Sequence, residues 1–190
     1  LADGVARRRG GSAGGVADAA GHQPRAGREL GDALGAHAGR EHALGGLADH
    51  AGLWRHLVQH DEDRRVYVRI HRDEVLDAWL ICWFGSQDTG LHDHDLSSGA
   101  VRVVDGTLTE DRLVMGEPGV VSTEHAAGDG FSFDSSRIHD VRNGGAGASV
   151  SLHLYSPPLE RMGYYEIAAD GCLARRNAPA SEELPPPVAA

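Results

Sequence analysis

The feature that most constrains this chain is a run of short strand-like segments separated by turn residues. From Val66 onward these segments are rich in Val, Ile, Leu and aromatic residues, and Gly, Asp, Asn or Pro residues lie between them. About eight short strands with frequent turns are typical of a β-sandwich or of a barrel with jelly-roll topology. We therefore predict a mainly β protein, with strands at 66–71, 77–84, 100–108, 112–114, 120–125, 129–134, 149–155 and 164–167.

The segments on either side of the strands predict the domain organisation. Between 29 and 59 the apolar residues recur at helical spacing, which predicts two or three short helices, interrupted near the glycine pair at 45–46. Residues 1–28 are rich in Gly, Ala and Arg without a periodic apolar pattern, so we expect them to be disordered or weakly ordered. The Pro-, Glu- and Ala-rich residues 176–190 predict a loose tail, which leaves a single domain at 29–175.

Composition excludes several classes of partner. The formal net charge of −10 argues against nucleic acid, which binds basic surfaces. No stretch approaches the roughly 18 apolar residues that a bilayer-spanning helix needs. Two cysteines, Cys82 and Cys172, are too few for a disulfide scaffold, and no secretory signal is evident. We expect a monomer in the cytoplasm that binds a small molecule.

A His-Asp-His sequence is the strongest local signal for chemistry. His92 and His94 stand two residues apart on an expected strand, so both imidazoles point to one face and could chelate one metal ion. Because the chain has twelve histidines, such a pair can arise by chance, and the alternative to metal binding is a structural or surface role. A later His139 lies between two expected strands, and Asp93 and Asp95 alternate to the opposite face. This order resembles the two metal motifs of the cupins, and residues 97–99 offer no carboxylate where many cupins carry a Glu. The resemblance implies three neutral imidazoles without a carboxylate ligand, a set that suits iron, zinc, copper or nickel.

Two further polar patterns lie on expected strands. Ser151, His153 and Tyr155 share one strand face, and burying such a stripe is costly unless its members bond each other or a ligand. The alternative is a solvated strand face. Tyr67 and Arg69 also share a face, and the planar fork of Arg69 suits a carboxylate. The flanking arginines, Arg64, Arg65 and Arg72, are expected to be solvated, and Glu110 is expected at a strand end on the surface.

Five ordered blocks of this sequence resemble the cysteine dioxygenase family, whose members have the cupin fold. The similarity spans about residues 44–170 and keeps the order and approximate spacing of the blocks. A single His-x-His is weak support, whereas five ordered blocks are strong. The matching blocks are Tyr67-Val68-Arg69, Leu80-Ile81-Cys82-Trp83, His92-Asp93-His94, residues 134–143 around His139, and Val150-Ser151-Leu152-His153-Leu154-Tyr155-Ser156-Pro157-Pro158.

The resemblance implies a fold, a cofactor and a role for each site residue. It implies a cupin jelly-roll barrel with short N-terminal helices, a mononuclear Fe2+ and dioxygen as co-substrate. It also implies a cis bond between Ser156 and Pro157. The implied iron ligands are His92, His94 and His139, the implied substrate-binding residues are Arg69 and Tyr67, and the implied catalytic residues are Tyr155, His153 and Ser151.

One position departs from the family pattern. Some animal members carry a cysteine just after the histidine pair, cross-linked to the active-site tyrosine, and here that position is Gly99. Tyr155 is therefore expected to be an unmodified phenol.

The expected activity is the iron-dependent addition of dioxygen to the thiol of L-cysteine, which gives cysteine sulfinate. A thiol dioxygenase for another small thiol, such as 3-mercaptopropionate, is the nearest alternative, but relatives of that kind usually carry glutamine in place of Arg69. A non-catalytic cupin that binds a metal or small ligand, and a zinc or nickel cupin isomerase, are the alternatives from other classes.

Overall fold

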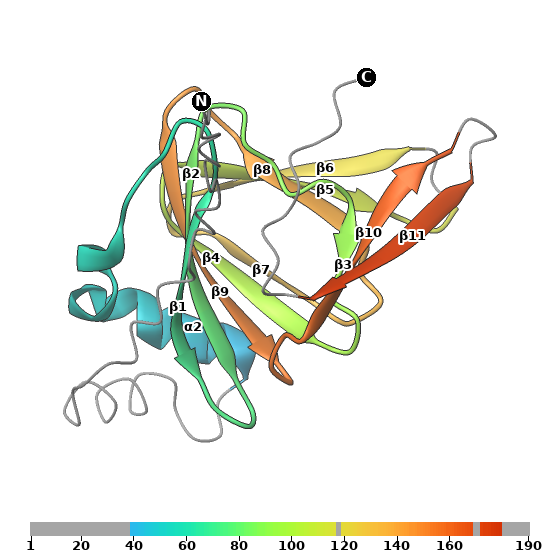
Figure 1. Cartoon of the computed structure of the whole chain (residues 1–190). Coiled ribbons are helices and arrows are strands. Elements are labelled where there is room, and N and C mark those ends of the chain that lie inside the picture. Colours follow the sequence, from blue (N-terminus) through green and yellow to red (C-terminus); the bar gives the residue numbers. More distant parts are fainter. Residues whose placement is uncertain (1–38, 117–118, 169–171, 180–190) are drawn as a thin grey trace, which may run out of the picture.

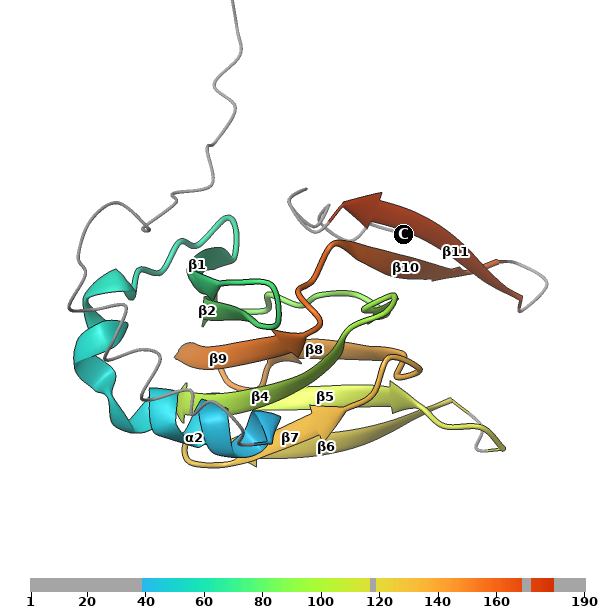
Figure 2. The same ribbon diagram turned by 90° about the horizontal axis from the view of Figure 1, so that it is seen from below.

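Two antiparallel sheets form the framework of the computed structural model, which describes residues 39–116, 119–168 and 172–179 (Figures 1 and 2). The five-stranded sheet has the order β1 (Val66–Arg72), β2 (Asp77–Phe84), β9 (Ala148–Ser156), β4 (Ser98–Asp105) and β7 (Gly130–Phe133). The six-stranded sheet has the order β11 (Leu173–Pro179), β10 (Arg161–Ile167), β3 (His92–Asp93), β8 (His139–Asn143), β5 (Thr107–Leu113) and β6 (Val120–Ala126). The predicted mainly β class is confirmed.

Strand β9 shows how the sequence divides the side chains between the two faces of its sheet. Val150, Leu152 and Leu154 are buried in the core cluster on the outer face of the five-stranded sheet. Their neighbours alternate to the inner face, as a period of two requires. Each fully buried leucine contributes roughly 1.5–3 kcal/mol of transfer free energy. The apolar residues of β9 therefore fix its register, and the polar stripe follows inward between β2 and β4.

A short helical segment covers the outer face of the five-stranded sheet. It consists of α2 (Arg40–Asp49) and two 3-10 turns, η1 (Ala51–Leu53) and η2 (Arg55–Leu57) (Figure 1). Leu44 and Leu47 of α2 pack against the outer residues of the sheet. The predicted short helices are confirmed, but the predicted break at 45–46 is wrong because the burial of these leucines carries the helix through the glycine pair. No helix within the described residues is both long enough and apolar enough to cross a membrane.

Several strand bounds differ from the sequence prediction. Strand β4 ends at Asp105 and β5 begins at Thr107, whereas the sequence suggested one strand over 100–108. The turn between them is at Gly106, where φ is +71° and an added Cβ would lie 2.6 Å from the carbonyl oxygen of Ala148. Only glycine fits this turn.

Two strands were missed, one is shorter than expected, and the predicted loose tail needs a correction. Strand β3, expected to carry both His92 and His94, has only two residues. Strand β8 was missed, although its residues alternate between buried and half-buried positions. Strand β11 is mostly exposed and polar, and pairs with β10 along its length. Residues 176–179, predicted to be loose, are therefore strand, since their order comes from backbone hydrogen bonds. The predicted segment 1–28, the first part of the predicted helical region at 29–38, and residues 180–190 lie outside the described residues.

Candidate functional site

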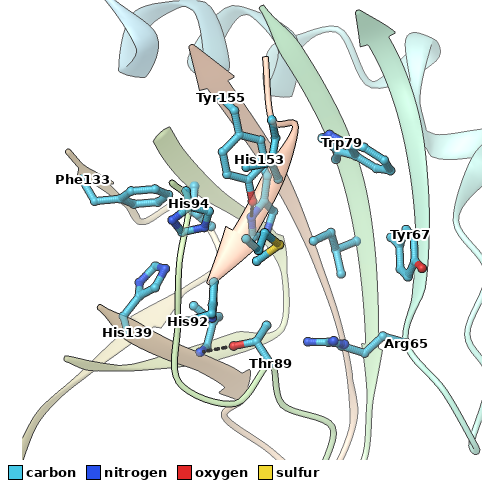
Figure 3. Close-up of a pocket in the computed structure, with 15 residues that line it drawn as sticks. Arg65, Tyr67, Trp79, Thr89, His92, His94, Phe133, His139, His153 and Tyr155 are labelled. Atoms are coloured by element: carbon cyan, nitrogen blue, oxygen red, sulfur yellow. Dashed lines mark hydrogen bonds between the residues drawn. The ribbon is translucent and has the colours of Figure 1, made fainter. Parts of the chain in front are cut away.

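Three buried histidines converge between the two sheets. His92 of β3 lies directly opposite His139 of β8, and His94 follows β3 at once. One ligand nitrogen from each ring lies within 4.8 Å of the others (Figure 3). Metal–nitrogen distances near 2.0–2.1 Å place two nitrogens that bind side by side on one ion about 3 Å apart, so the rings have to close by up to roughly 2 Å to share a metal. The structure thus brings together all three predicted ligands.

The protonation and orientation of these rings suit a metal ion. The Nδ1–H of His92 donates to the carbonyl oxygen of Gly90 at 2.9 Å, which leaves Nε2 as its lone-pair nitrogen. The Nε2 atom of His139 is buried and has no hydrogen-bond partner within the described part of the chain. Burial, and then the neighbouring His139, holds the pKa of His92 well below its ordinary value. Neutral imidazoles with free nitrogens fit a divalent transition metal.

A carboxylate that the sequence analysis placed on the surface supports the third ligand. Glu110 of β5 is 2% exposed, and its Oε1 accepts a hydrogen bond from Nδ1 of His139 at 2.8 Å. Burial alone would raise the pKa of Glu110, but the bond to His139 and the charges of Arg137 and Arg112 outweigh it and lower the pKa. The anion therefore fixes the tautomer and ring orientation of His139. The sequence signal that was missed is the alternation from Leu108 to Glu110, which places both side chains on the buried face of β5.

The aspartate between the paired histidines has a structural role. Asp93 points away from the three rings and accepts hydrogen bonds from Arg175 Nε at 2.6 Å and from the Tyr165 hydroxyl at 2.6 Å. Burial would raise the pKa of Asp93, but these bonds outweigh it and lower the pKa to about 2. The carboxylate ties β3 to β10 and β11. Among the described residues, the cluster that could hold a metal consists of histidines alone, as the sequence predicts.

The predicted polar stripe forms a continuous hydrogen-bonded chain beside the metal cluster. Trp83 Nε1–H donates to Ser151 Oγ at 2.9 Å, Ser151 Oγ bonds His153 Nε2 at 2.8 Å, and His153 Nδ1 lies 3.3 Å from the Tyr155 hydroxyl. Burial, followed by the neighbouring His139 and the charge of Arg65, lowers the pKa of His153 to about 3, so the ring is neutral. Burial also raises the pKa of Tyr155 above its ordinary value and keeps the phenol protonated.

The tyrosine at the end of this hydrogen-bonded chain borders the metal cluster. Its ring centroid lies 5.2 Å from that of His94. The geometry of the stripe is thus as expected, and the catalytic roles of its members stay predictions.

A small cavity joins these groups. Its volume is about 70 Å³. At roughly 15 Å³ of such space per water, this is room for about five water-sized groups, so the cavity is small. Its walls are Arg65, Tyr67, Trp79, Ile81, Thr89, His92, His94, Val101, Phe133, His139, Val141, His153, Tyr155, Leu159 and Met162 (Figure 3).

The two residues predicted to bind the substrate differ in position. Tyr67 lines the cavity beside Trp79, with ring centroids 6.0 Å apart. Arg69 is not among the lining residues: its Nε lies 3.3 Å from Oδ1 of the buried Asp77. Arg65, predicted to be solvated, instead lines the cavity, because strand alternation turns it to the same inner face as Tyr67. The substrate roles of Arg69 and Tyr67 stay predictions.

The position of the missing cysteine is filled by an aromatic ring. A Cβ on Gly99 would lie 2.4 Å from Cζ of Phe133 and 3.1 Å from the carbonyl oxygen of Leu154. The Phe133 ring stacks on His94, with centroids 4.5 Å apart. This ring therefore occupies the space that a side chain at position 99 would need, and Tyr155 has no cysteine partner there.

Comparison with known families agrees with this geometry. The family model described as "Cysteine dioxygenase type I" matches residues 44–167, about two thirds of the chain and every residue of the site. The chain belongs to this family. It is accordingly a thiol dioxygenase-type cupin with a three-histidine site, in an iron-dependent family. The family resemblance and the cupin fold predicted from the sequence are confirmed, and the Ser156–Pro157 bond is cis as the family resemblance implies.

Solved structures similar to this family member have low sequence identity to it. One, from Thermus thermophilus, is 18% identical and covers 55% of this chain and 93% of its own, with a TM-score of 0.48. Another, a protein with a double-stranded β-helix domain from Klebsiella pneumoniae, is 13% identical. The match covers 64% of this chain and 91% of that protein, with a TM-score of 0.47. A cupin superfamily protein from Desulfitobacterium hafniense is 9% identical. The match covers 55% of this chain and 87% of that protein, with a TM-score of 0.47.

Proposed function

We propose that this chain is a cysteine dioxygenase, which adds both atoms of dioxygen to the thiol of L-cysteine and gives cysteine sulfinate. The observation that carries the proposal is the cluster of three buried imidazoles without a carboxylate, inside a member of the cysteine dioxygenase type I family. Three neutral ligands leave several positions of an octahedral ion open for a substrate and for dioxygen. His92, His94 and His139 would hold ferrous iron, which when bound would supply a site for the thiolate and the redox chemistry with dioxygen.

The remaining residues of the pocket position the reactants and exclude water. Tyr155 keeps its proton, because burial raises its pKa, and so it can donate a hydrogen bond toward the cavity. His153 is neutral and ties that phenol to Ser151, and Trp83 in turn holds Ser151. Such a buried and fully bonded chain has little freedom to move, so the donor is held in place before the substrate arrives.

The size and charge of the pocket support a small thiol that carries a carboxylate. L-Cysteine has a thiol and an amine that could reach neighbouring positions on one ion, and a carboxylate that could reach an arginine of the inner face. 3-Mercaptopropionate lacks the amine but shares the other two groups. The two thiols are too similar in size for a cavity of about 70 Å³ to separate them, so a comparison of substrates has to do so.

Oxygen consumption by the iron-loaded protein tests the proposal. We expect uptake of dioxygen with L-cysteine, a much lower kcat/KM with 3-mercaptopropionate, and no uptake by the zinc-loaded protein. The matched control is His139→Ala, which removes one ligand and should abolish iron binding and uptake together. A clear preference for 3-mercaptopropionate would refute the choice of substrate, and the absence of uptake with every thiol would indicate a non-catalytic metal-binding cupin. Action as a monomer in the cytoplasm stays a prediction from the sequence.

A further inference from the structure

A surface groove lies directly outside the cavity. It has a volume of about 720 Å³ and lies where the β1–β2 turn, the segment after β3 and the connection from β9 to β10 meet. Its walls include Arg72, Leu96 and Glu160. His94 borders both the groove and the cavity, so the groove approaches the histidine cluster from outside.

The wall between the groove and the cavity is the segment 157–160, called here the connector, which joins β9 to β10. It passes beside the turn between β1 and β2 (Figures 1 and 2). Pro157, Pro158 and Glu160 border the groove. The side chain of Leu159 between them lines the cavity instead and is 5% exposed. Movement of Leu159 away from the cavity would therefore join the two spaces.

Side chains rather than strand pairing hold the connector in place. It lies between the end of β9 and the start of β10, and two of its four residues are prolines, which have no backbone N–H to donate. The carbonyl oxygen of Pro158 accepts a hydrogen bond from Ser97 Oγ at 3.4 Å, and that of Leu159 accepts one from Arg72 Nη1 at 3.2 Å. Segments with few backbone bonds of this kind open at a low free-energy cost.

The other walls of the cavity are held by the two sheets. Most of the lining residues lie on strands. Arg65 and His94 lie directly beside the ends of β1 and β3. Thr89 lies in a loop, but its backbone N–H donates to the carbonyl oxygen of Val141 at 2.9 Å. Among the described lining residues, Leu159 is therefore the one whose position depends most on contacts with side chains.

One arginine at the end of β1 ties the connector to the barrel. Arg72 Nη1 donates to the carbonyl oxygen of Leu159 and also to Oδ2 of Asp77 at 2.9 Å, and Arg72 Nη2 pairs with Glu160. The side chain of Asp77 has no exposed surface, so it anchors the guanidinium to β2. The side chain of Glu160 is 75% exposed, and its pair with Arg72 contributes little in water. The bond to the carbonyl oxygen of Leu159 is thus the contact that keeps the connector closed.

We infer that the groove is the entrance to the cavity, that the connector is its gate, and that Arg72 is the latch of this gate. When the bond from Arg72 breaks, Leu159 can swing outward, and a small solute in the groove can reach the histidine cluster beside His94. The inference goes beyond the proposed function, because it concerns how a ligand reaches the cavity, whatever the reaction there.

Chemical labelling of a thiol at position 159 measures how often the gate opens. Leu159→Cys places that thiol on the cavity side of the connector in the full-length protein, and iodoacetamide labelling is followed by peptide mass spectrometry. When opening and closing are fast relative to labelling, the rate is proportional to the population of the open form. Adding Arg72→Gln should raise the labelling rate by about tenfold or more, because the latch is lost. Glu160→Gln should raise it by less than about threefold, because that pair is exposed.

The two native cysteines serve as internal standards for this labelling. Cys172 is exposed and should react at one rate in every variant. Cys82 is 1% exposed in the core outside the five-stranded sheet, so it reports wider unfolding. The matched control is Arg142→Gln, which removes an arginine that pairs with Asp111 at 3.1 Å and should leave the rate at position 159 unchanged. An unchanged rate in Arg72→Gln, or an equal rise in both arginine variants, overturns the inference.

A second variant keeps the test decisive if Arg72→Gln destabilises the whole protein. Arg72→Lys keeps a positive charge beside the buried Asp77, but a single ammonium group lacks the planar fork that bridges Asp77 and the connector. If Arg72→Gln does not fold or also speeds the labelling of Cys82, Arg72→Lys decides. Faster labelling at position 159 with an unchanged rate at Cys82 supports the gate. No increase, or an equal increase at both thiols, overturns it.

Binding kinetics test whether the gate lies on the path of the ligand. L-Cysteine would be mixed with the iron-loaded protein without oxygen, and tryptophan fluorescence followed, since Trp79 lines the cavity. A gate changes the association and dissociation rate constants by one factor, so in Arg72→Lys both should rise by about threefold or more with the Kd unchanged. An unchanged association rate constant, or a changed Kd, overturns the inference. If the wild type binds no cysteine, the proposed function fails, whereas the labelling result still decides the gate.

Discussion

The buried carboxylate behind the third ligand gives a prediction that depends on the fold rather than on the motif. Glu110→Gln keeps the size of the side chain and removes its charge. In the wild type this anion accepts the Nδ1–H of His139 at 2.8 Å and a hydrogen bond from Arg137 Nη1 at 3.1 Å. Without the negative charge, the imidazole of His139 gives less electron density to a bound metal. The amide that replaces the carboxylate can also turn its NH2 group toward Nδ1 of His139.

The expected size of this effect follows from the position of the carboxylate. Partners that orient a metal-binding histidine typically change metal affinity by about 10- to 100-fold, or about 1.4–2.7 kcal/mol. The upper half of that range is expected here, because the Glu110 side chain is 3% exposed and water cannot replace it. The fold should survive, since Arg137 and Arg112, at 24% and 31% exposed, can turn toward solvent.

Competition with a coloured chelator under anaerobic conditions measures the iron affinity directly. The matched control is Asp111→Asn, the next residue of β5, which alternates to the other face and pairs with Arg142 Nε at 3.1 Å. It removes the same charge without touching the histidine cluster, so its iron affinity should equal that of wild type. Wild-type affinity in Glu110→Gln, or an equal loss in Asp111→Asn, would refute the reasoning.

Three further substitutions test separate parts of the account. Asp93→Asn should lower the free energy of unfolding in urea by about 2 kcal/mol, since it breaks charged hydrogen bonds to Arg175, and an unchanged midpoint would contradict this. Gly99→Cys should lower the melting temperature, because overpacking against Phe133 costs about 1–3 kcal/mol, and mass spectrometry should find no cross-link to Tyr155. Tyr155→Phe should bind iron normally but lower kcat about tenfold, the effect of about 1.4 kcal/mol in the transition state, and wild-type turnover would exclude the hydroxyl from the reaction.

The parts of the site that the sequence predicted are those with local patterns. The period of two placed Ser151, His153 and Tyr155 on one face of β9, because the intervening Leu152 and Leu154 need an apolar environment. The same period paired His92 with His94. Such patterns need no knowledge of which strands become neighbours.

The parts that the sequence missed depend on neighbours distant in the chain. Glu110 reaches His139 because β5 pairs with β8, and nothing near residue 110 indicates that pairing. Arg65 was predicted to be solvated because it lies among other charged side chains, and its place in the cavity wall depends on how the two sheets pack. Strand β11 was missed because its exposed polar residues carry no apolar period.

Isotope labelling tests the central claim most directly. The iron-loaded protein would be given L-cysteine under 18O2 in unlabelled water, and the mass of the oxidised product measured. Our account predicts a sulfinate with two 18O atoms, as expected if one metal ion held by His92, His94 and His139 directs both atoms of dioxygen to the thiol sulfur. Cystine as the main product, or a sulfinate with oxygen from water, would contradict it.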